Sequence, residues 1–303
     1  MQPHPDQLAA LVAIVEHGTF DAAARHLHVT PSAVSQRIRA LESAAGRVLV
    51  QRTTPCRPTE AGQTLLRLAR QTRLLYDEAR DALGDSRDDS GGVPLDLAVA
   101  VSADSLATWF RPVMSDVATW SGTTLRLHVE DQAHTAALLR RGDVLAAVTS
   151  EPTPVQGCVV EPLGVLRYRP VAAPDFAERW RVGRGHDWAR MPVVVFNEKD
   201  DLQHDLLAGR VGRGGPPPVV HRVPTSDDFR EAVRRGLGWG MLPDPQALPD
   251  LAEGRVVSLL TRGHVDVRLF WQRWRLDSLA LGTLTDVVRA AAREGLRRPP
   301  ASP

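Results

Sequence analysis

Polar side chains that can hydrogen-bond to nucleic-acid bases lie close together between residues 32 and 39 of the 303-residue chain. They are Ser32, Ser35, Gln36, Arg37 and Arg39. Glutamine and arginine each form paired hydrogen bonds to base edges in the major groove of DNA, and serine reaches bases or phosphates. These residue types at helical spacing therefore predict a helix that reads DNA.

The residues around this segment predict how the helix is positioned. Thr30 is suited to cap its start, and Pro31 to occupy its first position, where a missing N–H costs nothing. Its inward-facing residues are Ala33, Val34, Ile38 and Leu41. A short alanine-rich helix over residues 21–27 and a tight connection at 28–30 precede it. Together the two helices form a helix-turn-helix, whose second helix enters the major groove.

Two flanking elements complete this unit. A first helix ends at Gly18, and residues 49–59 form a short hairpin interrupted by Pro55 and Pro58. Up to Arg73 the chain holds nine arginines and five acidic residues, a local net charge of +4 that suits contact with phosphates. The predicted DNA contacts are Thr30, Ser32, Ser35, Gln36, Arg37, Arg39, Arg52, Arg57 and Thr59. The alternative is a helical bundle with a solvated polar face, but capping, spacing and outer-face chemistry all favour DNA binding.

A long helix is predicted from Thr59 to about Leu83. Its apolar positions are Leu65, Leu68, Thr72, Leu75, Ala79 and Leu83. This near-heptad spacing is typical of a helix that pairs with a copy of itself; packing on its own domain is the alternative. We therefore expect a DNA-binding domain at 1–59, a dimerising linker helix at 60–84 and a polar hinge at 85–93.

Beyond the hinge, strands alternate with helices, which indicates an α/β fold with parallel sheets. The predicted strands are 95–101, 125–129, 144–149, 166–173, 193–196, 219–223 and 267–271, and the helices are 105–120, 134–141, 202–208, 227–237 and 279–296. Two such runs, with the chain returning at its end, predict two lobes around a cleft. We expect an effector domain at 94–303, with lobe 1 at 94–164 and 266–296 and lobe 2 at 165–265.

Several polar side chains follow the predicted strands at the edge where open α/β sheets bind ligands. The candidate effector contacts are Ser102, Asp104, Ser105, Glu130, Asp131, Thr149, Ser150, Asn197, Asp200 and Trp239. Acidic groups from both lobes could hold a cationic side chain, and an amino acid would fit this chemistry. Acids after strands are also commonly helix caps or solvated loop residues, and Trp239 could lie by the cleft or in the core.

Other functions find little support in the residues. The two cysteines, Cys56 and Cys158, lie far apart without metal-ligand company, so we expect free thiols and no metal site. Gly236, Gly238 and Gly240 follow a helix and do not form a dinucleotide fingerprint. No nucleophile elbow occurs, and we expect neither catalysis nor a cofactor. The start of the chain lacks a signal-peptide pattern and no apolar run is long enough for a membrane span, so we expect a cytoplasmic protein.

Residues 20–42, with 49–52 and 57–62 of the hairpin, resemble the LysR-type transcriptional regulators. The family usually has Leu-Phe-x-Arg where this chain has Leu49-Val50-Gln51-Arg52, a mild departure. The resemblance implies a winged helix-turn-helix, a dimerising linker helix and a two-lobed effector domain like a periplasmic binding protein. It also implies a homodimer or homotetramer that bends promoter DNA differently when a small molecule binds, and that acts on RNA polymerase.

Blocks at 102–109, 147–152, 155–158, 196–203 and 236–241 are similar to the ArgP/LysG subgroup of that family. The subgroup implies a response to lysine or arginine and activation of a gene for a basic amino acid exporter. A regulator of the same architecture with a different effector, or a repressor, is the alternative. An enzyme or a periplasmic-type solute binder is a third class, which would make the helix-turn-helix incidental.

Overall fold

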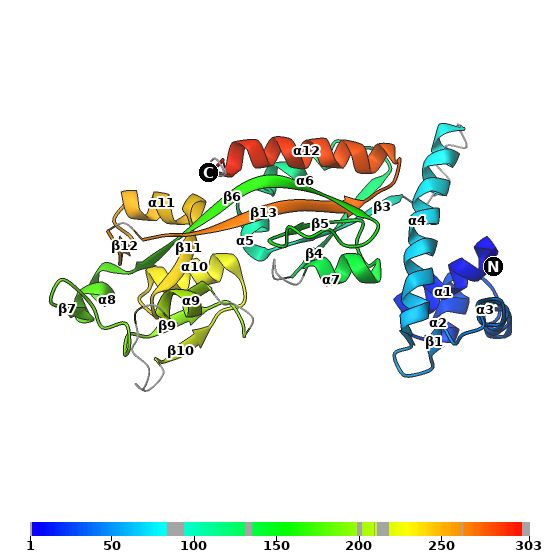
Figure 1. Ribbon diagram of the computed structural model, residues 1–303, viewed down its shortest axis with the longest axis horizontal. Helices are drawn as coiled ribbons and strands as arrows, with labels where there is room; N and C mark the ends of the chain where they lie inside the picture. Colours follow the sequence, from blue (N-terminus) through cyan, green and yellow to red (C-terminus); the bar gives the residue numbers. More distant parts are fainter. Residues whose placement is uncertain are drawn as a thin grey trace.

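The computed structural model describes residues 2–83, 94–130, 135–198, 202–208, 210, 218–261 and 263–298. The molecule is elongated, with a small helical unit at one end and a long sheet at the other (Figure 1). A single long helix stands between these two parts (Figure 1). The predicted class, α/β with an N-terminal winged helix-turn-helix and a two-lobed domain, is confirmed. No described helix has the length and apolar character needed to cross a membrane.

The N-terminal unit contains the elements α1 (Pro5–His17), α2 (Phe20–His26), α3 (Pro31–Ala45), β1 (Val50–Gln51) and β2 (Arg57–Pro58). As predicted, Gly18 ends α1 in the left-handed conformation, and the Thr30 hydroxyl caps α3 by accepting from the Ala33 N–H. The strands β1 and β2 pair antiparallel and form the expected hairpin. One hydrophobic core joins the three helices, to which α3 contributes Val34, Ile38 and Leu41.

The long helix α4 (Glu60–Ala82) confirms the predicted linker helix, but its apolar face divides among several partners. Leu65, together with Leu66 and Ala69, is buried in the N-terminal core. Leu74 is buried with the C-terminal core instead. Leu68, Leu75, Tyr76 and Leu83 are exposed. Of the predicted heptad positions, Leu65 is therefore buried in a core of the chain, whereas Leu68, Leu75 and Leu83 remain on its surface.

The C-terminal domain is built on one large mixed sheet, with β11-β6-β13-β5-β3-β4 in order and β12 beside β6. Its strands are β3 (Leu95–Val101), β4 (Thr123–Val129), β5 (Ala146–Thr149), β6 (Cys158–Ala172), β11 (Gly240–Pro243), β12 (Val257–Ser258) and β13 (Val265–Trp274). Only β3, β4 and β5 are parallel to one another. The expectation of parallel strands is wrong for the rest of this sheet, because β6 and β13 form a long antiparallel pair; it is confirmed for residues 193–195 and 220–222 of the second lobe, which pair parallel.

That antiparallel pair runs the length of the domain and joins the two lobes (Figure 1). The predicted lobe boundary between residues 164 and 165 falls inside β6, and the register of the pair shifts between Leu269 and Phe270. Gly164 lies at this point, where an added Cβ would come within 2.9 Å of the Arg297 carbonyl oxygen. The close approach of the chain end therefore requires glycine at this position.

Helices cover both faces of the sheet. The helices of the C-terminal domain are α5 (Ala103–Ala107), α6 (Arg111–Val117), α7 (Thr135–Arg141), α8 (Pro174–Arg179), α9 (Leu202–Ala208), α10 (Ser226–Arg234), α11 (Asp244–Ala252) and α12 (Leu279–Gly295). The helix α12 lies along one side of β6 and β13, and α7 lies on the opposite side (Figure 1). The second lobe adds the parallel pair β9 (Val193–Val195) and β10 (Val220–Arg222) and the hairpin β7 (Arg181–Val182) and β8 (Gly185–His186).

One predicted helix, at residues 105–120, is wrong as a single element. The chain forms α5 and α6 instead, because Thr108 leaves the helical conformation with φ −124° and ψ −104°. Pro112, in the first turn of α6, has no N–H with which to continue a helix from the preceding turn. The break brings α5 to the junction of the lobes, and α6 packs under α12.

A buried carboxylate fastens α11 to α10. The Asp250 side chain is fully buried and accepts hydrogen bonds from Arg230 at 2.7 and 2.8 Å and from Arg255 at 2.7 Å. Burial by itself raises the pKa of Asp250, but the hydrogen bonds from Arg230 and Arg255 outweigh it and hold that pKa below its usual value. Removing the charge from this carboxylate would deprive both guanidinium groups of the buried anion that they share.

We predict that Asp250→Asn lowers the free energy of unfolding at pH 7 by roughly 2–4 kcal/mol, less than for a fully buried pair because both arginines are partly exposed. A depressed carboxyl pKa contributes stability above its unfolded value and loses it on acidification. The difference between the variant and the wild type should therefore shrink below about pH 4. Urea unfolding at several pH values measures both effects; a difference that stays constant to pH 3 would contradict this account.

Candidate functional site

The outer face of α3 carries the predicted base-reading side chains. Ser32, Gln36 and Arg39 are exposed, opposite the buried side of the helix. Ser35 is half-buried at the flank of this face. Arg37 is also half-buried, and its guanidinium pairs with Asp6 of α1 at 3.0 Å. The structure thus brings Ser32, Gln36 and Arg39 together on one exposed face of α3, whereas Arg37 also ties α3 to α1; their contact with the major groove stays a prediction.

Two of the predicted DNA contacts have a structural task in the chain. The Thr30 hydroxyl accepts from the Ala33 N–H at 3.2 Å and is hydrogen-bonded to the Ser32 hydroxyl at 2.9 Å. The Thr59 hydroxyl donates to the Val48 carbonyl at 2.8 Å and accepts from the Gly62 N–H at 3.0 Å. Both threonines therefore position the start of a helix, and contact with DNA by either residue stays a prediction.

The hairpin carries two of the predicted DNA contacts, both arginines. Arg52 and Arg57 are exposed. The guanidinium of Arg52 lies over the ring of Phe20, 4.9 Å from its centroid, which restricts the directions this side chain can take. The Cys56 N–H donates to the Gly18 carbonyl at 2.7 Å and so ties the hairpin to the turn before α2. The Glu42 carboxylate of α3 accepts from the Leu49 and Val50 N–H groups at 2.9 and 3.4 Å, so the hairpin is held against both α2 and the end of α3, as the wing of a winged helix.

Three of the predicted effector residues lie at the carboxyl ends of β3 and β5. Ser102 caps α5, and its hydroxyl donates to the Ser105 hydroxyl at 2.9 Å while accepting from the Ser105 N–H at 3.3 Å. Both serines are buried. Thr149 is also buried, and its hydroxyl accepts from the Glu151 N–H at 3.0 Å. These three hydroxyls are buried polar groups at the ends of the parallel strands β3 and β5.

Asp104, between Ser102 and Ser105, contacts the other lobe. Its carboxylate accepts from the hydroxyl of Ser226, at the start of α10, at 2.8 Å. The Ser226 hydroxyl in turn accepts from the side-chain amide of Gln246 in α11 at 3.0 Å. An exposed ion pair between Arg111 of α6 and Asp227 of α10, at 3.6 Å, lies nearby. The lobes are thus joined by a chain of hydrogen bonds that includes one predicted effector residue.

Ser226 and Gln246 are absent from the sequence-based list of effector contacts. Ser226 follows a strand and starts a helix of the second lobe, the position that drew attention to Ser102 in the first lobe. The same rule applied to residues 219–223 would have found it. Gln246 lies in α11, a helix that was not predicted, and its sequence offers no comparable signal.

The other described candidates divide between strand ends and the core. Glu130, Ser150 and Asn197 are half-buried and follow β4, β5 and β9. Trp239 is fully buried, and its ring meets that of Trp188 edge-on with centroids 5.0 Å apart. Of the two places considered for Trp239, the structure therefore shows the core. Asp131 and Asp200 lie outside the described residues.

The sequence and the fold agree with one family of bacterial proteins. The model of the bacterial regulatory helix-turn-helix protein of the lysR family matches residues 5–63, and that of the LysR substrate binding domain matches residues 90–293. The fold and its two sites therefore define a ligand-responsive type of DNA-binding regulator. This chain belongs to the LysR family of transcriptional regulators.

Its similarity to particular members extends over nearly the whole chain. It is 51% identical to the lysine export transcriptional regulatory protein LysG of Corynebacterium efficiens, covering 97% of this chain and 99% of that protein. The crystal structure of ArgP from Mycobacterium tuberculosis matches with a TM-score of 0.86 and 46% identity, covering 99% and 100% of the two chains. Full-length LysG from Corynebacterium glutamicum with bound effector Arg matches with a TM-score of 0.81 and 48% identity, covering 97% and 99%.

We predict that Gln36→Ala weakens binding to the preferred DNA sequence about ten- to a hundredfold, the ~1–3 kcal/mol of a lost bidentate base contact. Discrimination at one base pair should be lost while binding to unrelated DNA changes little, because Gln36 carries no charge. Fluorescence anisotropy against a fragment selected by the wild type from a random pool measures this. Gln71→Ala, on α4, is the control; equal weakening for selected and unrelated DNA would show that Gln36 does not read bases.

Proposed function

We propose that this regulator is a cytoplasmic sensor of lysine or arginine that activates a gene for a basic amino acid exporter. Asp104 carries the proposal, since it places a carboxylate at the junction of the two lobes and bonds to Ser226 across it. An ammonium or guanidinium group is the natural partner of such a carboxylate. The names of its relatives support the export role, and the arginine bound to LysG of Corynebacterium glutamicum supports the ligand class.

We propose that the segments of the chain have the functions that the sequence predicted. Residues 1–59 bind DNA, 60–84 form the linker helix, 85–93 are the hinge and 94–303 bind the effector. Ligand binding would change the relative position of the two lobes. This would alter how the recognition helices bind the promoter, and consequently how RNA polymerase binds the promoter. A regulator of this architecture with another effector, or one that represses, is the competing function.

We predict that L-arginine or L-lysine binds the full-length protein, and that citrulline and norleucine, which lack the side-chain cation, bind at least tenfold more weakly. Asp104→Asn should lower the affinity for the cationic ligand at least tenfold, because the ion pair between this half-buried carboxylate and the ligand cation is lost. Isothermal titration calorimetry measures both. Asp96→Asn, at the opposite end of β3, is the control. Tight binding of a neutral ligand, or no effect of Asp104→Asn, would favour the competing function.

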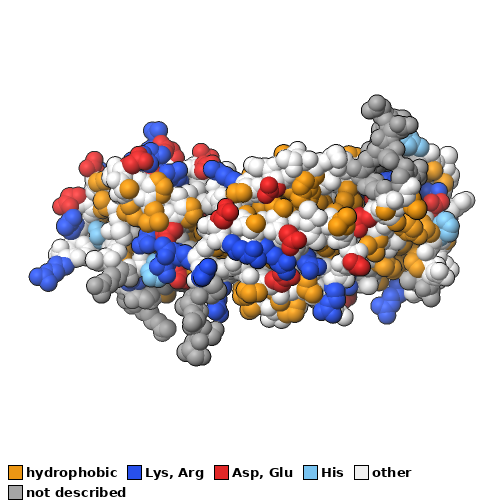
Figure 2. Space-filling view, turned by 90° about the horizontal axis from the view of Figure 1, so that it is seen from above, with side chains coloured by type: hydrophobic (Ala, Val, Ile, Leu, Met, Phe, Trp, Pro, Cys, Tyr) orange, Lys and Arg blue, Asp and Glu red, His pale blue; other side chains and the backbone are white. Residues whose placement is uncertain are grey.

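We propose that α4 pairs with its copy in a second subunit. Leu68, Leu75 and Tyr76 are 40%, 39% and 60% exposed, which is unusual for apolar side chains on one helix. Tyr76 also lines a groove between α1 and α4 with a volume of about 300 Å³, together with Leu8 and Val12 among others. Figure 2 shows hydrophobic side chains gathered on the surface at this end of the molecule.

We predict that Leu68→Glu combined with Leu75→Glu converts the oligomer to monomers at micromolar concentration, because charges placed in an apolar interface lose their hydration. Light scattering coupled to size-exclusion chromatography measures the mass. Leu279→Glu is the control, since Leu279 is 82% exposed on a different helix. Unchanged mass in the double variant would place the interface elsewhere.

A further inference from the structure

Three residues on one side of α4 contact the effector domain. Arg70, Leu74 and Glu78 are spaced four residues apart, so they lie above one another along the helix. We call these three residues the docking stripe. Each makes a different kind of contact, and together they extend over most of the C-terminal half of α4.

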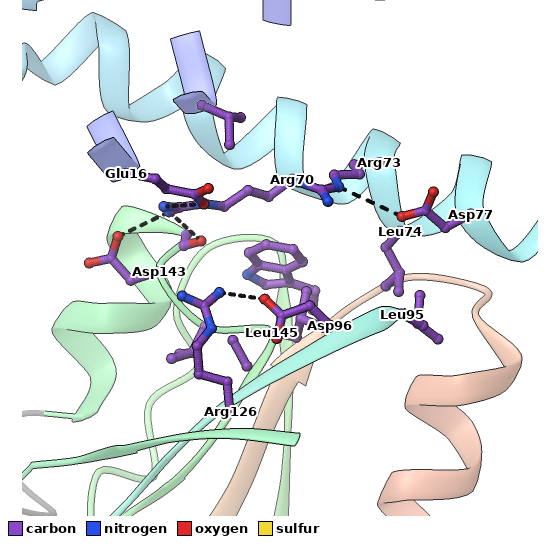
Figure 3. Close-up of a pocket in the computed structure, with 15 residues that line it drawn as sticks. Glu16, Arg70, Arg73, Leu74, Asp77, Leu95, Asp96, Arg126, Asp143 and Leu145 are labelled. Atoms are coloured by element: carbon purple, nitrogen blue, oxygen red, sulfur yellow. Dashed lines mark hydrogen bonds and ion pairs between the residues drawn. The ribbon is translucent and has the colours of Figure 1, made fainter. Parts of the chain in front are cut away.

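Arg70 pairs with acids of both domains (Figure 3). Its guanidinium donates to the Gly142 carbonyl at 2.8 Å and to the Asp143 carboxylate at 3.0 Å, in the turn between α7 and β5. On its other side it lies 3.5 Å from the carboxylate of Glu16, in α1 of the DNA-binding domain. The Arg70 side chain is only 14% exposed, so solvent competes weakly for these partners.

The turn that receives Arg70 is shaped for α4. Gly142 has a φ of +72°, and a Cβ there would lie 2.9 Å from the Cα of Arg67. The helix and the turn are thus in backbone-to-backbone contact, which leaves no room for a side chain between them. This close contact fixes the distance between α4 and the turn, and the ion pair of Arg70 with Asp143 stabilises it.

The two other members of the docking stripe contact the core and α12. Leu74 is 4% exposed and belongs to the core of the effector domain. The Glu78 carboxylate accepts from the Ser278 hydroxyl at 2.6 Å and from the Ala280 N–H at 3.0 Å, at the start of α12. A carboxylate at a helix N-terminus is further stabilised by the helix dipole. The helix α4 is therefore held to the effector domain at three successive turns.

The opposite end of α12 reaches the second lobe. Arg297, just beyond α12, donates to the Asp244 carboxylate of α11 at 3.0 and 2.7 Å. Its backbone exchanges two hydrogen bonds with Val165 of β6, at 2.9 and 3.0 Å. The helix α12 thus spans from the junction of the lobes to α4. A displacement of lobe 2 relative to lobe 1 has a continuous packed path to the linker helix.

We propose that Arg70 is a positioning residue that fixes the orientation of the DNA-binding domain on the effector domain. The helix α4 shares a core with α1 and α3, so a change in how it docks moves the recognition helix with it. Arg70 is the member of the docking stripe that touches both domains at once. The effector domain and the DNA-reading surface are therefore coupled through α4, whose docking this guanidinium secures.

A spin-label experiment tests the orientation without any ligand. Labels on cysteines introduced at Ser43 of α3 and Asp116 of α6, both exposed, report the distance between the domains in full-length protein. Labelled subunits are diluted into unlabelled ones, so that distances within one chain dominate; the native cysteines are buried. We expect one narrow distance distribution for the wild type and a distribution at least twice as broad for Arg70→Gln.

Arg73→Gln is the matched control. Arg73 lies one turn further along α4, is 49% exposed and pairs with Asp77 of the same helix at 3.7 Å. Its distribution should stay narrow. Asp143→Asn should broaden the distribution on its own and add little to Arg70→Gln, because the two variants remove one contact. It also serves as the test if Arg70→Gln fails to fold. A narrow distribution in both variants, or a broad one in the wild type, would overturn the proposal.

A second readout concerns the response to ligand and rests on the proposed function. We expect Arg70→Gln to keep the affinity for L-arginine but to reduce, at least threefold, the factor by which L-arginine changes DNA affinity. A residue that only stabilises the fold would lower the melting temperature and leave this factor unchanged. If the wild type binds neither arginine nor lysine, the proposed function fails, and the spin-label distances still decide the role of Arg70.

Discussion

The packing of α4 into two hydrophobic cores is the constraint on which the rest of the structure depends. Leu65, Leu66 and Ala69 complete the core of the DNA-binding domain, and Leu74 is buried with the core of the effector domain. A helix cannot rotate one of these faces without disturbing the other, because the i to i+4 ladder makes it stiff along its length. The position of α4 therefore links the orientation of the recognition helix to the conformation of the effector domain.

The long antiparallel pair of β6 and β13 has the equivalent place in the effector domain. Both strands pass from one lobe to the other, so the lobes share a sheet rather than a flexible connection. Polar groups then join the lobes beside it, through Asp104 with Ser226 and through Arg297 with Asp244. A ligand that pairs with Asp104 competes with or reinforces one of these links, which gives a small molecule leverage over the geometry of the whole domain.

Local rules succeeded where the decisive contacts are close in sequence. Thr30 as a cap, Gly18 as a stop and the hairpin at 49–59 are settled within a few residues, and each was predicted correctly. They failed for α11, where Pro245 and Pro249 suggest a loop. Pro245 falls in the first turn, where no N–H is needed, and Asp250 pairs with Arg230 of another helix as well as with Arg255 just beyond α11. Arg37 looked like Arg39 in the sequence, since nothing local shows that Asp6 lies beside it.

The sequence alone determined that this protein has a winged helix-turn-helix, a linker helix and a two-lobed α/β domain, because capping, periodicity and strand–helix alternation act over short distances. The tertiary structure alone decided which side chains meet across those elements. The division of the apolar face of α4, the burial of Trp239, the bond between Asp104 and Ser226 and the pairing of Arg70 with two domains all join residues separated by tens to hundreds of positions. Such pairings depend on how whole elements pack, and no pattern within a single segment encodes them.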